Sequence, residues 1–484
     1  MKIAIYAPIA LWEVHLAQAI EIAHTNHSEG KEVHVIHCKG SLTSCAANML
    51  HEEIKCGECR LQTQASIYRQ FPESTFHHDL ERARLPKSLM QKIQEIDSLD
   101  TLKGFAYDNH LFGLSVFTSL VTQNRDWNLD FQQIRERAID LLINSIEHYL
   151  AMRSLLQEGF DEFFVFGGRR ASEALGAFAA LSNGIQVNYF EHGSKAGRYW
   201  ITKNKVFTWD GIKNEISNWK SEFWNTQVHS KEREALGEEF FSDLRSSKIK
   251  DPYFRSYLSD YHEELAIETS RPLMAVFTSS LWEFAGYDEL HECPEDFLDQ
   301  YALYEKIGSD KEIQEKYQLV FRWHPHLKRA GKDEVKRIEE VILNTNSCLH
   351  IKPDDPINSY HVMEIADVIV TVGSTMGIES AAFGKPSILL GKSSYSGIGA
   401  VYEPLDYEQF KQLVERVPKA LPKERALLYG DWASNYGKEF RFIKREGTGY
   451  YIAHERIERR SVSYRFKRWV FRGRGKLSRK FSKI

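Results

Sequence analysis

The spacing of apolar residues along the chain changes between continuous runs, typical of buried strands, and steps of three and four, typical of helices. Near the start, "KIAIYAP" and "KEVHVIHC" predict strands, and "WEVHLAQAIEIAHTNHSEG" between them predicts a helix that stops at Gly30. Residues 87–160 are rich in helix formers, and "FQQIRERAIDLLINSIEHYLAMRSLLQEG" has its apolar residues at helical steps. The chain therefore opens as an α/β unit that carries a helical insertion.

Strands and helices alternate again after the insertion. The fold class that this alternation predicts is α/β, with parallel sheets wound by right-handed crossovers. Because there are two such series, we expect two Rossmann-like domains that face each other across a cleft. The predicted strands of the first series continue with "EFFVFGG", "IQVNYFEHG" and "KVFTWD", and those of the second are "PLMAVFTSS", "YQLVFRWHP", "SCLHIKP", "DVIVTVG" and "KPSILLG".

The boundary between the two series is predicted within residues 231–270, which are charged and have few strong apolar runs. We therefore expect an N-terminal domain over 1–265 and a C-terminal domain over 266–440. Residues 441–484 are expected to form a C-terminal helix and a basic tail.

Composition and charge are those of a soluble globular protein. Of the 484 residues, 42% are hydrophobic and 27% are charged, and the net charge of −4 points to no class of partner. No apolar stretch approaches the roughly 18 residues of a membrane span, and Pro8 interrupts the N-terminal apolar run. We expect neither a secretory signal nor a spanning helix, and hence a cytoplasmic protein.

Hydroxyl and glycine residues follow the predicted strand "DVIVTVG". Ligands of such sheets bind outside the carboxyl ends of the strands, and Gly373 there lets the backbone approach a ligand. Ser374 and Thr375 stand at the start of the next helix, where they can bind a phosphate, and Glu379 one turn later can accept ribose hydroxyls. A plain helix cap followed by a glutamate is the alternative interpretation.

A second set of anion-seeking residues follows the strand "YQLVFRWHP". Pro325 halts this strand and fixes the backbone after His324, whose imidazole can donate to a phosphate oxygen or act as a general acid. Arg322, His326 and Lys328 add positive charge. A solvated loop would also carry such residues, but two strand ends of one predicted sheet both present anion-binding groups.

A third candidate place is the end of the strand "IQVNYFEHG". Glu191 and His192 precede Gly193 and can be presented on a tight turn, as is needed to deprotonate an acceptor hydroxyl. Arg169 and Arg170 follow the neighbouring strand after a Gly-Gly turn, and either bind a ligand or simply begin a solvated helix.

The pieces "FGGRR", "FEHG", "FTSS", "RWHP" and "ADVIVTVGSTMGIESAAFGKPSILLG" occur in an order that resembles the capsule polysaccharide biosynthesis glycosyltransferases. These are GT-B proteins related to bacterial Kdo transferases and sialyltransferases. The resemblance covers roughly residues 1–440, except 61–160, where no motif is recognised.

The resemblance implies roles for several residues. It implies that His324 with Pro325, and Ser374 with Thr375, hold the donor nucleotide. The family's catalytic base lies in an acid–acid–glycine motif, which is matched by Glu191 and His192 before a glycine. Because histidine replaces the second acid, either residue can be the base.

The predicted reaction is sugar transfer from a nucleotide-sugar donor, CMP-activated by analogy with the relatives, to a growing surface polysaccharide. No Asp-x-Asp stands at a strand end, and the adjacent acids of "KPDDPIN" are interpreted as a helix cap, so no catalytic metal is expected. The alternatives are a polyol-phosphate transferase using a CDP-glycerol-type donor, with His192 as base, a sugar-nucleotide epimerase, and a non-catalytic scaffold.

Four cysteines stand close together in the sequence, spaced C-x6-C-x10-C-x2-C. The closing Cys-x2-Cys is typical of a zinc knuckle, and an iron–sulfur cluster also takes four thiolates. We expect a structural zinc, with an iron–sulfur cluster or four metal-free thiols as alternatives. The predicted ligands are Cys38, Cys45, Cys56 and Cys59.

The end of the chain, residues 459–484, contains no acidic residue and interleaves aromatic with basic residues. This composition favours docking on an anionic membrane surface, at the inner face of the cytoplasmic membrane, where a lipid-linked or polysaccharide acceptor would lie. Nucleic acid, which we do not expect as a partner, and a tail without a specific role are the alternatives.

Overall fold

The chain folds into two compact units, each of which is described by itself. Unit 1 contains residues 1–123, 129–206 and the chain from 437 onward, and unit 2 contains 124–128 and 207–436. The computed structural model describes residues 1–62, 68–193, 197–203, 209–225, 230–246, 270–286, 293–447 and 449–457.

Unit 1 is built on a seven-stranded sheet in the order β12-β6-β5-β4-β1-β2-β3. The chain moves outward from β1 through β2 to β3 and then returns to the other side of β1 with β4 and β5, all parallel. The point at which the direction reverses therefore lies between β1 and β4. The strands are β1 (Lys2–Tyr6), β2 (Glu32–His37), β3 (Phe76–Asp79), β4 (Glu162–Phe166), β5 (Gln186–His192), β6 (Arg198–Thr202) and β12 (Lys438–Glu439).

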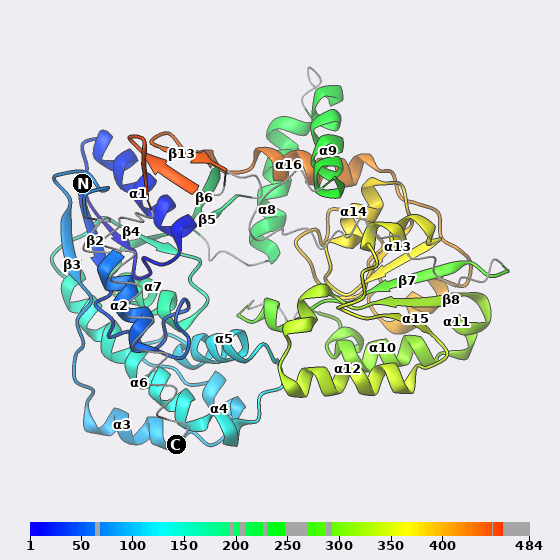
Figure 1. The fold of residues 1–484 in the computed structure, drawn as a ribbon, viewed down its shortest axis with the longest axis horizontal. Helices are drawn as coiled ribbons and strands as arrows, with labels where there is room; N and C mark the ends of the chain where they lie inside the picture. The colour runs from blue at the N-terminus through cyan, green and yellow to red at the C-terminus, as the bar shows by residue number, and fades with distance from the viewer. Residues whose placement is uncertain are drawn as a thin grey trace. The chain divides into compact units, whose positions relative to one another are not determined.

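Helices cover both faces of this sheet (Figure 1). Alternate residues of a strand point to opposite faces, so Ile3 and Ile5 of β1 pack in the same core as Leu16 and Ile20 of α1. Tyr6 instead faces α7. The predicted helical insertion is confirmed between β3 and β4. The helices are α1 (Glu13–Ser28), α2 (Glu53–Gln62), α3 (Lys87–Gln94), α4 (Leu99–Lys103), α5 (Phe112–Asn124), α6 (Phe131–Leu156) and α7 (Ala171–Ser182).

Unit 2 is built on a five-stranded parallel sheet in the order β11-β10-β7-β8-β9. All five residues of β7 are buried, as expected for a strand covered on both faces. Here the direction reverses between β7 and β10. The strands are β7 (Leu273–Phe277), β8 (Gln318–Arg322), β9 (Leu349–Ile351), β10 (Val368–Thr371) and β11 (Ser387–Leu389).

The helices of unit 2 pack on both faces of its sheet, since two separate apolar cores contain alternate residues of the same strands. The short turns are η2 (Lys220–Trp224), η3 (Leu281–Phe284), η5 (Glu295–Phe297) and η6 (Pro325–Arg329). The helices are α8 (Trp209–Trp219), α9 (Ser230–Arg245), α10 (Gln300–Ser309), α11 (Lys311–Lys316), α12 (Lys332–Asn344), α13 (Ser359–Ile365), α14 (Met376–Ala382), α15 (Tyr407–Leu413) and α16 (Glu424–Asn435).

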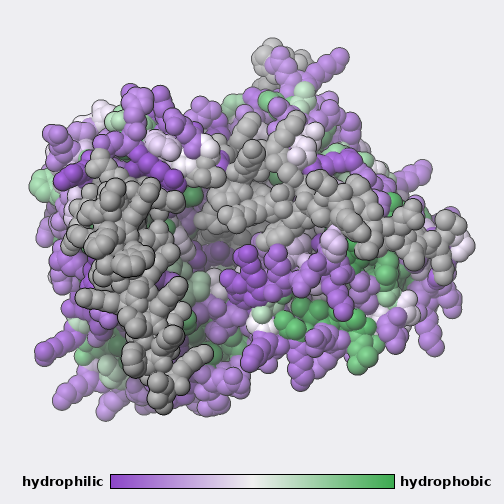
Figure 2. Space-filling model, viewed as in Figure 1, coloured by the Kyte–Doolittle hydropathy of each residue, from purple (hydrophilic) through white to green (hydrophobic). Residues whose placement is uncertain are grey.

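The two Rossmann-like units predicted from the sequence are therefore confirmed, and their arrangement across a cleft stays a prediction. None of the described helices combines the length and apolar character that a membrane span needs. On the face drawn in Figure 2, hydrophilic residues cover most of the described surface. The predicted strand "KVFTWD" and the tail 459–484 lie outside the described residues, except that Trp209 and Asp210 begin α8.

The unit boundary differs from the one expected at residue 265, because α8 and α9 belong to unit 2. Ile216 of α8 and Phe241 of α9 are buried in one core with Leu427 and Trp432 of α16. The high charge of α9 indicated a linker in the sequence analysis. In the structure, the adjacent Phe240 and Phe241 of this helix are buried in the core of unit 2.

The end of the described chain also differs from expectation. Residues 441–457 form no helix but a small antiparallel sheet, β13 (Ile443–Glu446), β14 (Gly449–Ile452) and β15 (Glu455–Arg456). This sheet packs beside α1 (Figure 1), where Glu21 accepts hydrogen bonds from the backbone N–H groups of Phe442 and Ile443, each at 2.9 Å. Segment 437–457 thus returns to unit 1.

Gly237 allows α9 and α16 to approach closely, and Gly237→Ala should destabilise unit 2. A Cβ at this position would lie 2.3 Å from the carbonyl oxygen of Leu427, which belongs to the backbone and cannot turn aside. The expected loss is about 1–3 kcal/mol, as for overpacked cores, and exceeds the roughly 1 kcal/mol gained from helix propensity. The melting temperature should fall for Gly237→Ala but not for Glu239→Ala, an exposed position of the same helix. Equal melting temperatures would contradict the close packing.

Candidate functional site

The carboxyl ends of β7, β8 and β10 are joined by two buried hydroxyl residues. Thr278 and Ser279 follow β7 directly. The Oγ1 of Thr278 accepts a hydrogen bond from the backbone N–H of His324 at 2.9 Å, and the Oγ of Ser279 donates to the carbonyl oxygen of Val372. Because β7 and β10 flank the reversal point, these bonds hold three strand ends where sheets of this type bind ligands.

His324 is held in one orientation at the end of β8. It caps the turn η6, with Pro325 as the first residue of that turn, and its Nδ1 accepts the backbone N–H of His326 at 3.3 Å. This bond assigns the proton of the neutral ring to Nε2. Burial lowers the pKa of His324 to about 4, with the charges of His326 and Arg322 acting in the same direction against Glu283. At neutral pH, His324 is therefore an uncharged ring that can donate a hydrogen bond from Nε2, and the general-acid role predicted for it remains a prediction.

Glu283, from the turn η3, lies beside both histidines. Its carboxylate contacts Nδ1 of His326 and accepts a hydrogen bond from the hydroxyl of Ser280 at 2.6 Å. Burial opposes its ionisation, but the hydrogen bonds from His326 and Ser280, together with the charge that either histidine carries when protonated, outweigh burial and lower the pKa of Glu283. One ligand atom each from Glu283, His324 and His326 lie within 4.8 Å of one another, a separation that could also suit a metal ion.

The turn after β10 is shaped by close contacts. Gly373 has a φ of 85°, and a Cβ there would lie 3.0 Å from the ring of Phe284. The carbonyl oxygen of Ser374 accepts the hydroxyl of Tyr395 at 2.6 Å, and its side-chain oxygen lies 3.4 Å from the backbone nitrogen of Met376. The hydroxyl of Ser374 is thus near the start of α14, as expected, while Thr375 is the exposed cap residue of that helix.

Glu379 and Arg322 have partners within the protein. The carboxylate of Glu379 is buried and accepts the hydroxyl of Tyr360, and burial raises its pKa. Arg322 is 3% exposed, and its guanidinium donates to the carbonyl oxygens of Lys352 at 2.7 Å and Trp323 at 3.2 Å. Both side chains thus brace the strand ends, and the ligand-binding roles predicted for them remain predictions.

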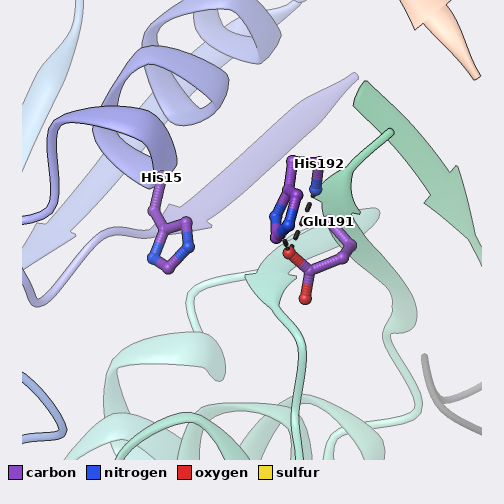
Figure 3. Close-up of side chains that lie close together, drawn as sticks. All are labelled: His15, Glu191 and His192. Atoms are coloured by element: carbon purple, nitrogen blue, oxygen red, sulfur yellow. Dashed lines mark hydrogen bonds and ion pairs between the residues drawn. The ribbon is translucent and has the colours of Figure 1, made fainter. Parts of the chain in front are cut away.

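In unit 1, the end of β5 brings together two histidines and a carboxylate (Figure 3). Nδ1 of His192 contacts the Oε1 atom of Glu191, which also accepts the backbone N–H of His192 at 3.0 Å. His15, from α1, adds a third side chain, with one ligand atom of each residue within 4.8 Å of the others. Burial, followed by the charges of His192 and Arg170, lowers the pKa of His15 well below its usual value. The ring of His15 is therefore neutral.

Next to this group is a small hollow at the reversal point between β1 and β4. Its wall is largely apolar, with aromatic side chains from Tyr6, Trp12, Phe166 and Phe190. It contains one buried carboxylate, that of Glu173, whose Oε1 lies 3.3 Å from Nη2 of Arg170. Burial raises the pKa of Glu173, against the charges of Arg170 and Arg169. The aromatic and ionisable residues that line the hollow are Tyr6, Trp12, His15, Phe166, Glu173 and Phe190.

The four cysteines of the predicted metal site lie in the loop after β2 and in α2. None forms a disulfide. No three of their sulfur atoms lie within 4.8 Å of one another, since the described triads at that separation contain only histidines and carboxylates. Burial raises the pKa of Cys45 to about 12 and that of Cys59 to about 11, and in both cases neighbouring cysteines contribute. The metal site stays a prediction at this point.

Several site residues were missed by sequence analysis. Thr278 and Ser279 were quoted only as part of "FTSS", although their place after a buried strand is the signal that marked Ser374. Glu283 and His15 carried no such signal, because each comes from an element whose position over a strand end depends on the tertiary fold.

No protein-family model and no curated protein sequence matches the chain. Among solved structures it is similar to the β-Kdo 2,4-transferase of KpsC from Thermosulfurimonas dismutans, with 15% identity and a TM-score of 0.36, and the match covers 56% of this chain and 80% of that one. It is similar to the β-Kdo 2,7-transferase of the same protein with 14% identity and a TM-score of 0.34, and that match covers 58% of this chain and 80% of the other. It is also similar to the UDP-GlcNAc 2-epimerase of Methanocaldococcus jannaschii in complex with UDP-GlcNAc and UDP. The identity is 12% and the TM-score 0.29, and the match covers 89% of this chain and 98% of that one. The fold assignment rests on the two sheets described above.

The state of His324 can be tested by nucleotide binding. If the neutral Nε2–H contacts a phosphate, His324→Asn should weaken binding about 10- to 100-fold, as for a hydrogen bond to a charged group. The pKa of His324 is about 4. The ratio of the dissociation constants of the variant and the wild type should therefore stay constant between about pH 5.5 and 8 and rise only at lower pH, where the ring gains a proton. Calorimetric titration with CMP, CDP and UDP measures it. A ratio that rises as pH falls through about 6.5 would show an ordinary, solvated histidine.

Proposed function

We propose that this protein is a glycosyltransferase that moves a sugar from a nucleotide-sugar donor to a growing surface or capsular polysaccharide, without a catalytic metal. Unit 2 would bind the donor and unit 1 the acceptor. The observation that carries the proposal is the joined set of strand ends in unit 2, where Thr278 and Ser279 hold His324 beside the Gly373–Ser374 turn.

The unit 2 site has the donors that a departing nucleotide phosphate needs. Charge develops on the phosphate as the glycosidic bond breaks, and fixed hydrogen-bond donors stabilise it without reorganising. The Nε2–H of His324 and the hydroxyl of Ser374 are such donors, while Pro325 fixes the backbone between His324 and the rest of the turn.

Unit 1 supplies the base in this proposal. With Glu191 against Nδ1 of His192, the proton of the neutral ring is favoured on Nδ1, which leaves the lone pair of Nε2 to accept a proton from the acceptor hydroxyl. Glu191 then stabilises the imidazolium that forms, as the carboxylate of a catalytic triad does. His192 is thus proposed as the base and Glu191 as the residue that orients it. His15 would lie beside the bound acceptor, because one of its ring nitrogens is within 4.8 Å of ligand atoms of both Glu191 and His192.

The absence of a catalytic metal is part of the proposal. Each histidine–carboxylate group has its carboxylate already in contact with a histidine, Glu191 with His192 and Glu283 with His326. A divalent cation would have to break these contacts. Sugar transfer should therefore continue in the presence of EDTA. If EDTA abolishes the activity and added Mg²⁺ or Mn²⁺ restores it, the reaction needs a metal and the metal-independent mechanism is wrong.

The roles of Glu191 and His192 are separated by substitution. His192→Gln should lower kcat by about 10²- to 10⁴-fold, the usual contribution of a general base, and leave donor binding intact. Glu191→Gln should retain more activity than His192→Gln, because the imidazole is still present. His454→Gln, exposed on the β14–β15 turn, serves as control. An active His192→Gln beside an inactive Glu191→Gln would make Glu191 the base.

A polyol-phosphate transferase is the second candidate, because a histidine in the base position suits that chemistry as well. The two reactions leave different products. With a donor labelled in the phosphate next to the transferred group, radioactivity stays on the nucleotide in sugar transfer and moves into the polymer in polyol-phosphate transfer.

We further propose that residues 459–484 hold the protein at an anionic membrane surface on the cytoplasmic side, where lipid-linked acceptors would lie. Co-sedimentation with vesicles containing anionic lipid should be salt-sensitive and should be lost when these residues are removed. Undiminished sedimentation of the shortened chain would refute this.

A further inference from the structure

Unit 1 contains a second pocket, of about 200 Å³, on the side of its sheet that α1 covers. The wall of this pocket comes from the last turns of α1, from β4, β5 and β6, and from β12. It shares no lining residue with the hollow between β1 and β4. The pocket is therefore separate from the candidate sites described above, although it is built from segments far apart in the sequence.

A buried asparagine amide lines this pocket. Asn188, in the middle of β5, is 5% exposed. Its backbone takes part in the pairing of β5 with β4, but no described residue forms a hydrogen bond with its side chain. Burying an amide without a partner costs free energy, whereas an apolar side chain here would extend the core that contains Ile22 and Phe164. The amide is therefore available to a ligand that can both accept and donate hydrogen bonds.

Two carboxylates and two amines also line the pocket. The Nζ of Lys31 lies 3.0 Å from Oε2 of Glu29 and 3.6 Å from Oε2 of Glu162. Lys438 is exposed, and the pairing of β12 with β6 holds it opposite Tyr199. The formal charges of these four charged side chains cancel. The pocket therefore suits an uncharged polar ligand better than a phosphate, which the two carboxylates would repel.

Aromatic side chains and the size of the pocket narrow the class of ligand further. Phe164 and Tyr199 line the pocket, and the ring of Tyr199 is held by stacking on Phe440, with 5.3 Å between the ring centroids. The volume is below the roughly 300–1,000 Å³ of pockets for drug-sized ligands, so a single ring fits better than a nucleotide. A sugar ring is uncharged, has hydroxyls that donate and accept, and has C–H groups that pack on apolar side chains.

We propose that this pocket is a second glycan-binding site, which holds one sugar residue of the growing polysaccharide away from the point of reaction. Asn188 and His192 lie on the same face of β5, and four residues of a strand span about 13 Å. A polymer held in the pocket thus stays close to the proposed base. The polysaccharide as ligand rests on the proposed function, whereas the binding of a sugar ring does not.

Binding of free sugars tests the pocket without a transferase assay. Saturation-transfer NMR of the full chain with glucose, galactose, N-acetylglucosamine and N-acetylgalactosamine should show binding of at least one of these sugars. If none of the four binds, the proposal is overturned. Binding of cytidine or uridine that is lost in Asn188→Leu, without binding of a sugar, would overturn the carbohydrate class.

Substitutions assign the bound sugar to this pocket. Asn188→Leu should weaken sugar binding at least about tenfold, and Lys438→Ala about two- to tenfold, as for the loss of hydrogen bonds to the ligand. Lys444→Ala, an exposed lysine of β13 that does not line the pocket, should leave the affinity unchanged. If Asn188→Leu does not fold, Lys438→Ala at its exposed position decides. Unchanged affinity in the folded variants of Asn188 and Lys438 would overturn the proposal.

Transfer kinetics separate this site from the proposed reaction. Asn188→Leu should raise the KM for a polysaccharide acceptor about tenfold and leave kcat and the KM for the nucleotide-sugar donor unchanged, because the pocket is separate from the reacting groups. A sugar that binds the pocket while the KM for the polysaccharide stays the same in Asn188→Leu would overturn the role in holding the polymer. If no sugar is transferred by the wild type, the proposed function is wrong, and the NMR titrations alone decide whether the pocket binds sugars.

Discussion

Two hydroxyl groups at the end of β7 hold the candidate donor site together. Three parallel strands end at one edge of the unit 2 sheet, but parallel pairing alone does not fix the path of the chain beyond each strand. Thr278 fixes the segment after β8 and Ser279 the segment after β10. The position of His324 relative to the Gly373–Ser374 turn thus depends on these bonds, which are buried and therefore costly to break.

The two units place their chemistry at equivalent points. In each, the first strand of the sheet is followed by strands on one side and then on the other. The candidate histidines, His192 and His324, lie at the carboxyl ends of β5 and β8, each one strand away from the pair that flanks the reversal. The same topology supports different chemistry in the two units. Unit 2 offers an uncharged imidazole and hydroxyls, and unit 1 offers a histidine backed by a carboxylate beside an aromatic hollow.

The sequence predicts all five strands of the unit 2 sheet and β1, β2, β4 and β5 of unit 1, because buried parallel strands appear as short apolar runs. It missed β3, β6 and β12 of unit 1, which are short and largely half-buried or exposed. His324, Ser374 and His192 could be identified because each lies at, or just after, the end of such a strand. Glu283 and His15 could not, since their place depends on how a turn or helix packs over the sheet. The same limit explains the boundary error at α9, where two phenylalanines within a charged helix make the contact with α16. The antiparallel β13–β15 sheet was missed because its strands are short and half exposed.

The most direct measurement is a crystal structure of the protein with a nucleoside diphosphate bound. The account predicts that the phosphates lie in unit 2, with an oxygen within hydrogen-bond distance of Nε2 of His324 and another near the hydroxyl of Ser374. A nucleotide bound elsewhere, or phosphates that leave Nε2 of His324 without contact, would contradict it.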